Sequence, residues 1–225
     1  MIPSFEDRQP EQIITDSNYF ESSGRIYKAL SWLDYAKRNT NVSALEYAAL
    51  ETRLGIEQLL FEQLVVGVGS EIEQQEYKKC KGNAKVLDQI LKRLIPKYEK
   101  LVDFTRALAP DNIPISKWDN HRLIQYSGKV STYLHWSGGL DTTVQSEKWF
   151  ANGIQTVQEA ANYVWETLTK GNTAVMNIED SPLEIQDLWE QYSGGQTTLE
   201  SAASRAEILE PILQERLTNA GKGRS

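Results

Sequence analysis

The stretch from Asn41 to Gly69, NVSALEYAALETRLGIEQLLFEQLVVGVG, constrains the fold most, because it is the longest run of helix-forming residues in the chain. Placed on a helix, its apolar residues span one broad arc, and the residues opposite that arc face solvent. The arc consists of Leu45, Ala49, Leu50, Leu54, Ile56, Leu60, Phe61 and Leu64, and the opposite side of Glu51, Gly55, Gln58 and Glu62. The stretch therefore predicts a long amphipathic helix.

Three charged residues break this pattern. Glu46 projects into the middle of the apolar arc, as do Arg53 and Glu57, seven and eleven residues further along the same face. A buried charge needs a partner, and Arg53 and Glu57 are i,i+4 neighbours that can pair within the helix. Glu46 also fits a capping box with Ser43 as the N-cap residue, and Asn41 is a good N-cap residue in its own right. This charged stripe has three interpretations: a structural ion pair, a polar cleft between helices, or a face buried by a partner helix in an oligomer.

Composition limits the kinds of partner and the compartment. The 225 residues carry a formal net charge of −7, which disfavours broad non-specific binding to nucleic acid but leaves room for a local basic patch. Cys80 is the only cysteine, so the chain has no intramolecular disulfide and no cysteine metal cluster. No apolar run reaches the length of a membrane span, and the acidic, proline-containing N-terminus is not a signal peptide. These features predict a cytoplasmic protein with no membrane partner.

The remaining periodic segments predict more helices, joined by short connections. A helix from Ser17 or Ser23 to Arg38 precedes the central stretch. An amphipathic segment covers residues 84–108, with a kink at Pro96. The next two helices run from Ser116 or Asp119 to Trp136, and from an N-cap at Ser146 to about residue 170.

The C-terminal quarter predicts two further helices. Ser181 at the N-cap and Pro182 at the first position start one that ends at Gly194, and a last segment over 198–217 is interrupted by Pro211. The fold class is therefore all-α: an antiparallel four-to-five-helix bundle over residues 17–171, with a small C-terminal helical appendage. The predicted divisions are an extended arm (1–16), the bundle (17–171), the appendage (172–218) and a disordered tail (219–225).

Residues with obvious chemistry are scarce. The two histidines are His121, on an exposed helical position, and His135, at the end of its helix beside Trp136. His135 is either a helix C-terminal residue favoured by the dipole or a general acid or base at the mouth of the bundle. Glu-x-x-His pairs, phosphate-binding glycine loops and dinucleotide fingerprints do not occur, so the sequence predicts no metal and no cofactor.

The helical pattern resembles that of the HEPN superfamily of prokaryotic helical-bundle proteins. The resemblance covers residues 20–171 and rests on three segments: Tyr47-Ala48-Ala49-Leu50-Glu51 leading into Arg53, Ile56-Glu57-Gln58-Leu59-Leu60, and Tyr133-Leu134-His135. HEPN nucleases include RNA-cleaving toxins and phage-defence effectors, usually dimeric, and their hallmark is an Arg followed four to six residues later by a His. In this chain Lys129, not Arg, stands six residues before His135. The resemblance therefore implies a non-nuclease or divergent member.

Two functions follow from these observations. The first is a cytoplasmic interaction module, a homodimer that recognises a protein or small ligand through the bundle face and its aromatic-rich ends. Its predicted binding residues are Arg53, Glu57, Glu46 and Trp136. The alternative is a divergent HEPN-like ribonuclease or phage-defence or toxin–antitoxin effector. It would act on RNA, with Arg53 and Glu57 in the site and His135 as the catalytic residue for proton transfer.

Overall fold

The computed structural model describes residues 21–68, 78, 83–109, 115, 117–135, 146–170 and 175–222. Across these residues the protein has eight helices and no strand, which confirms the predicted all-α bundle. The described residues divide into two compact units. Unit 1 combines the residues up to Leu94 with Trp118–Lys170, and unit 2 combines Ile95–Lys117 with the residues after 170. No helix in these ranges is both long enough and apolar enough to cross a membrane.

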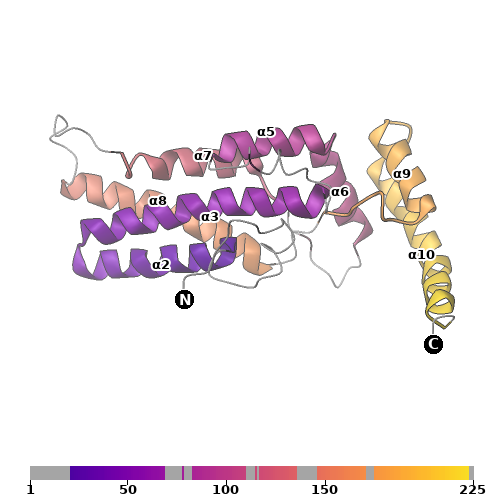
Figure 1. The fold of residues 1–225 in the computed structure, drawn as a ribbon, viewed down its shortest axis with the longest axis horizontal. Coiled ribbons are helices and arrows are strands. Elements are labelled where there is room, and N and C mark those ends of the chain that lie inside the picture. Colours follow the sequence, from indigo (N-terminus) through magenta and orange to yellow (C-terminus); the bar gives the residue numbers. More distant parts are fainter. Residues whose placement is uncertain are drawn as a thin grey trace. The chain divides into compact units, whose positions relative to one another are not determined.

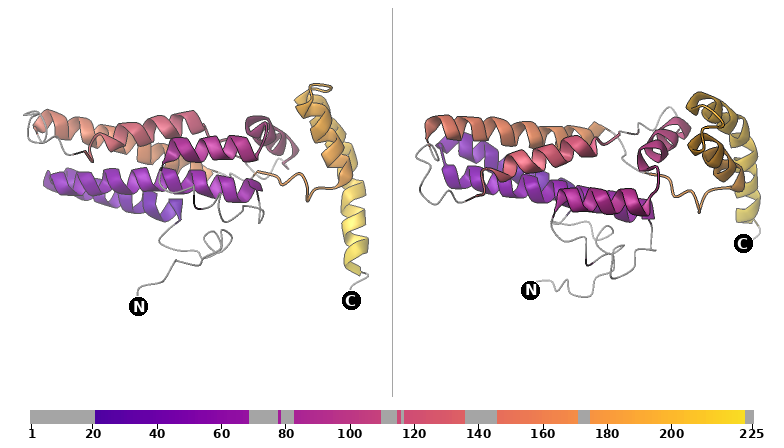
Figure 2. Two further views of the ribbon diagram at one scale, coloured as in Figure 1. Left: turned by 45° about the horizontal axis from the view of Figure 1, so that its top comes forward. Right: turned by 90° about the horizontal axis from the view of Figure 1, so that it is seen from above.

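Within the described residues of unit 1, five helices form a bundle in which one helix contacts all the others. The central helix is α3 (Val42–Val68), and it packs against every other helix of the unit (Figures 1 and 2). Those helices are α2 (Ser22–Asn39), α5 (Ala84–Leu94), α7 (Asn120–Ser131) and α8 (Glu147–Lys170). A helix with neighbours on several sides needs apolar residues around most of its circumference, and α3 has them.

The side of α3 predicted to face solvent is instead covered by α2. Gly55 is buried there, and a Cβ at this position would lie 2.8 Å from Cδ1 of Ile26 on α2. Further along the same side, the carboxylate of Glu62 accepts a hydrogen bond from the backbone N–H of Ser22 at 2.9 Å. The prediction was wrong on this side because small and polar residues also fill helix–helix contacts when glycine permits close approach and a polar partner is present.

Three predicted helix starts are confirmed by their capping bonds. Asn41 caps α3, since its Oδ1 accepts from the N–H of Ala44 at 2.8 Å. Asp119 caps α7 and Ser146 caps α8, through bonds of 2.9 Å and 3.2 Å from the third residue of each helix. Asn41 takes the N-cap position that the capping-box interpretation gave to Ser43, which is exposed in the first turn. Helix α7 ends at Ser131, before the predicted end at Trp136.

Pro96 separates two helices where the sequence predicted one kinked helix. Helix α5 ends at Leu94, and α6 (Tyr98–Leu108) begins after a three-residue turn. Lys97 in this turn has a φ of +62°, which an α-helix does not tolerate. Because Pro96 lacks a backbone donor and clashes with the preceding turn, the apolar periodicity alone does not hold the helix together. The chain passes from unit 1 to unit 2 at this turn.

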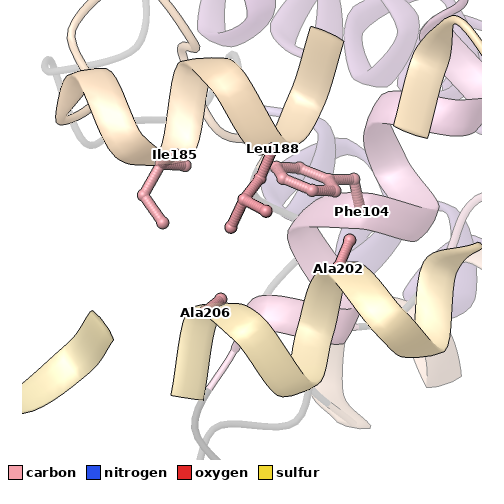
Figure 3. Close-up of a cluster of buried hydrophobic side chains, with 5 residues drawn as sticks. All are labelled: Phe104, Ile185, Leu188, Ala202 and Ala206. Carbon is pink, nitrogen blue, oxygen red and sulfur yellow. The ribbon is translucent and has the colours of Figure 1, made fainter. Parts of the chain in front are cut away.

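Unit 2 is a small helical cluster built from α6 and two C-terminal helices, α9 (Leu183–Ser193) and α10 (Leu199–Lys222). Figure 3 shows its buried core, which consists of Phe104, Ile185, Leu188, Ala202 and Ala206. From the sequence, α6 was predicted to belong to the bundle, and the appendage was predicted to begin at residue 172. The compact units instead group α6 with the C-terminal helices, because Phe104 supplies the large side chain of their core.

Two expected details of the C-terminal helices differ in the structure. Helix α10 continues through Pro211, where an interruption was predicted. Ser181 does not cap α9: the N-cap residue is Pro182, and the Ser181 hydroxyl donates to the carbonyl oxygen of Asn177. An alternative local hydrogen bond overrides the capping signal of Ser181. Residues 219–222, predicted to be disordered, instead belong to α10. The predicted arm (1–16) and residues 223–225 lie outside the described residues.

Candidate functional site

The charged stripe on α3 contains an ion pair within the helix. Nε of Arg53 donates to Oε1 of Glu57 at 3.0 Å, as the i,i+4 spacing predicted. Glu57 is buried, whereas about a third of the Arg53 side chain is exposed. Glu46, nearer the start of α3, is partly buried. Arg53 binds Glu57 through its Nε edge and so neutralises a buried carboxylate. This structural role is enough to explain why both charges occur in the apolar arc.

The structure does not bring His135 to this pair through any hydrogen bond or ion pair among the described residues. His135 is exposed and lies four residues beyond the end of α7. Tyr133, in the turn before His135, and Leu45, near the start of α3, both lie against Gly153 of α8. A Cβ on Gly153 would lie within 3 Å of each of them. Arg53 lies eight residues beyond Leu45, a rise of about 12 Å along α3. Trp136, the fifth predicted site residue, lies outside the described residues.

A solvent-exposed aromatic patch covers one side of the α2–α3 hairpin. We define it by four large side chains that remain 38–53% exposed: Trp32, Tyr35, Tyr47 and Leu50. The ring centroid of Trp32 lies 5.3 Å from that of Tyr47 across the two helices and 6.3 Å from that of Tyr35 on the same helix. The aromatic rings therefore form one continuous apolar surface. The sequence could have indicated Trp32 and Tyr35, because they lie beside the apolar face of α2. It could not have indicated their contact with Tyr47, because that contact is tertiary.

Charged residues next to the aromatic patch are paired within the hairpin. Arg25 of α2 forms a 3.0 Å ion pair with Glu51 of α3, next in sequence to Leu50. Arg38 binds the carboxylate of Asp34 through Nε at 3.1 Å and Nη2 at 2.9 Å. Lys28, one turn before Trp32, and Glu46, next to Tyr47, add one charge of each sign, so the charges beside the patch sum to zero.

A second cluster links α7 to α8 through a cation and three aromatic rings. The guanidinium of Arg122 donates to Oη of Tyr126 from Nε at 3.2 Å and from Nη2 at 2.9 Å. Its Cζ also lies 4.1 Å from the ring centre of Tyr163, which contacts Trp118 edge-on. The hydrogen bond to Tyr126 raises the pKa of Arg122, and burial raises the pKa of Tyr163. The i,i+4 spacing of Arg122 and Tyr126 could have been read from the sequence, whereas the contact with Tyr163 could not.

The carboxyl group of Glu62 gives unit 1 a predictable pH dependence. Burial raises its pKa above the ordinary value of 4.5, the hydrogen bonds from Ser22 offset this only in part, and nearby Glu21 adds to the rise. The folded protein therefore binds the proton more tightly than the unfolded chain. The stabilisation from this group is fully present below pH 4.5 and is lost as the pH rises through the folded-state value.

We therefore expect Glu62→Gln, which keeps the shape but does not titrate, to change the pH profile of stability. Chemical denaturation of both proteins at several pH values measures the free energies of unfolding. From neutral pH towards pH 4.5, the wild type should gain stability relative to Glu62→Gln. Taking the difference cancels the other titrating groups that both proteins share. Two parallel profiles would show that Glu62 titrates alike in the folded and unfolded states.

Comparisons with known proteins add no assignment: no family model matches the chain, and no curated protein or solved structure is significantly similar to it. Within the described part of the chain, no group of three or more His, Cys, Asp or Glu side chains is placed to hold a metal ion. The geometry of the aromatic patch and of the Arg122 cluster must therefore carry the functional argument.

Proposed function

We propose that this protein is an interaction module that forms a homodimer through the aromatic patch on the α2–α3 hairpin. The patch itself is the observation that carries this proposal. Trp and Tyr are enriched at the centres of protein interfaces, where large rigid rings contribute contact area at a low cost in conformational entropy. Trp32, Tyr35 and Tyr47 place three such rings on one exposed surface of a rigid helical hairpin.

A second copy of the chain is the occupant that the surrounding charges favour. A two-fold symmetric interface places a surface against itself, so any unbalanced charge would face its own sign. The ion pairs Arg25–Glu51 and Asp34–Arg38 reduce this repulsion, and the other charges beside the patch, Lys28 and Glu46, are of opposite sign. The rings of Trp32 and Tyr47 can then pack against their counterparts in the other subunit, in offset or edge-on arrangements.

The predicted catalytic alternative gains less support from the geometry. Glu57 occupies one edge of Arg53, and the exposed His135 lies beyond the end of α7. A proton-transfer site needs its groups within hydrogen-bond reach of one another or of a shared substrate. The ribonuclease function and the resemblance to HEPN proteins stay predictions.

The homodimer is tested by changing the patch without changing the core. We expect the double variant Trp32→Ala, Tyr47→Ala to weaken self-association by at least about tenfold, because each truncation removes more than about 1 kcal/mol of interface contact. Sedimentation velocity over a range of micromolar concentrations measures the dissociation constant. Circular dichroism verifies that the variant keeps its helices.

Tyr27 provides the matched control. Tyr27 lies on α2, as Trp32 does, and is 62% exposed. Its ring, however, contacts Trp165 of α8 instead of the patch. Tyr27→Ala should therefore leave the dissociation constant of the dimer unchanged. A wild-type protein that stays monomeric throughout the concentration range would contradict the proposal, as would equal effects of the control and the patch variant.

A further inference from the structure

Two helices of unit 1, α5 and α7, carry basic residues and almost no acidic ones. The chain as a whole has a net charge of −7. Helices α5 (Ala84–Leu94) and α7 (Asn120–Ser131) nevertheless contain five basic residues. The single carboxylate in these two helices is that of Asp88. Asp88 is buried, and it is bound by Lys92 at 2.9 Å and by the Asn120 amide at 3.3 Å. The exposed charge of these two helices is therefore strongly basic.

Arg122 on α7 is held in a fixed orientation although it is exposed. Two donors of its guanidinium converge on Oη of Tyr126, and the guanidinium lies over the Tyr163 ring. The carboxylate of the neighbouring Asp119 accepts from the N–H of Arg122 as the N-cap of α7. The Nη1 group makes no hydrogen bond to any residue that the structure describes. An arginine held in this way loses little side-chain entropy when it binds an anion.

Lys129 stands two turns further along α7, on the same side. Its Nζ lies 5.9 Å from the centre of the Tyr126 ring, and Cζ of Arg122 lies 5.3 Å from the same centre. Lys129 is exposed and has no ion-pair partner within the described ranges. Two cations therefore flank one buried tyrosine, and one partner surface carrying two negative charges can reach both.

The chemistry of this site favours carboxylates over a phosphodiester backbone. Tight binding to nucleic acid comes from neutralising many phosphates, and a chain with net charge −7 opposes the approach of such a dense polyanion. The rings of Trp118 and Tyr126 are buried, so they offer no platform on which bases could stack. Two acidic side chains seven residues apart on a partner helix are separated by a rise of about 10.5 Å, the spacing that Arg122 and Lys129 have on α7.

We propose that Arg122 and Lys129 form a docking site for an acidic segment of a partner protein. Arg122 binds one carboxylate through its outward guanidinium edge, and Lys129 binds a second carboxylate as a point charge. Tyr126 and Tyr163 position Arg122 for this contact. The site uses none of the residues of the aromatic patch, so it stands independently of the proposed homodimer.

The test uses the full chain and a fluorescein-labelled helical peptide that carries glutamate pairs at i,i+7 positions. Fluorescence anisotropy measures its dissociation constant, in parallel with the same peptide carrying glutamine at these positions and with a single-stranded RNA oligonucleotide. We expect the glutamate peptide to bind more tightly than both other probes, and more weakly as salt is added. Arg122→Gln, Lys129→Gln should weaken its binding by about tenfold or more.

Two further variants separate docking from general electrostatics. Lys37→Gln, Lys148→Gln removes the same charge from exposed positions of α2 and α8 outside both proposed surfaces and should change peptide binding less than about twofold. Tyr126→Phe keeps both cations but releases the guanidinium, so binding should weaken several-fold.

Tighter binding of the RNA than of the glutamate peptide would overturn the proposal. Equal losses of peptide affinity in the control variant and in Arg122→Gln, Lys129→Gln would also overturn it. The same holds if the glutamate peptide binds no more tightly than its glutamine counterpart. Thermal melts verify that every variant is folded.

Discussion

Replacing Phe104 with alanine is expected to lower the free energy of unfolding of unit 2 by about 3–5 kcal/mol, the usual cost of truncating a buried aromatic ring. Phe104 is completely buried and is the largest side chain in a core that otherwise contains Ile185, Leu188 and two alanines (Figure 3). Its ring stacks on Tyr192 at 5.9 Å and contacts Trp189 at 5.5 Å. A core with so few large side chains has little material with which to refill the cavity.

Hydrogen exchange measured by mass spectrometry locates this loss in the chain. Amides in α9 and α10 should exchange faster in Phe104→Ala than in the wild type, because the free energy of opening of their cluster falls. Ile208→Ala on α10 is the control, since Ile208 is 72% exposed and its truncation should alter stability by less than about 0.5 kcal/mol. Unchanged exchange in both helices after Phe104→Ala would show that Phe104 is not the centre of this core.

Leu60→Ala should be the most destabilising single truncation along the middle of α3, at about 2–5 kcal/mol. Leu60 is completely buried on the helix that contacts every other helix of unit 1. A cavity at this position therefore removes contacts from a helix around which the whole bundle is packed, and the surrounding rigid helices collapse only partly into it.

Urea denaturation followed by far-ultraviolet circular dichroism measures this effect in unit 1. Val66→Ala on the same helix is the comparison, because Val66 is exposed and its truncation leaves no cavity. We expect a clear loss of stability for Leu60→Ala and a change of less than about 0.5 kcal/mol for Val66→Ala. Similar losses in the two variants would mean that helix propensity, and not core packing, holds α3 in place.

Local signals in the sequence were reliable where the physics itself is local. The capping side chains of Asn41, Asp119 and Ser146 lie within three residues of the donors that they satisfy, so the sequence located the starts of α3, α7 and α8. The i,i+4 pair Arg53–Glu57 follows from helix geometry in the same way. The all-α class follows from apolar periodicity repeated over several segments.

The same local reasoning failed where two local signals competed. Apolar periodicity continues in phase across Pro96, but the missing donor and the left-handed Lys97 end one helix and start another. Pro211 has the same local chemistry, yet α10 continues through it. Ser181 binds Asn177 instead of capping α9. In each case the difference between the alternatives is only a few kcal/mol, which packing elsewhere can reverse.

The candidate surfaces depended on contacts that span long stretches of sequence. Trp32 and Tyr47 meet across the α2–α3 hairpin, and Arg122 lies over a tyrosine 41 residues further along the chain. The sequence placed each of these residues on a helix, but it could not say which helix would lie beside it. The stripe on α3 drew attention to Arg53 and Glu57. The aromatic patch borders this stripe at Leu50, and the Arg122 cluster lies on α7 and α8.

By itself, the sequence determined the helical class, most helix starts and the ion pair within α3, because these depend on residues a few positions apart. Only the tertiary structure decided that α2 covers the side of α3 carrying Gly55 and Glu62, that α6 joins the C-terminal helices around Phe104, and that no hydrogen bond or ion pair among the described residues joins His135 to Arg53. The physical reason is that an apolar helix face specifies burial but not its partner. The choice among partners rests on how side chains of distant segments fill one another's gaps.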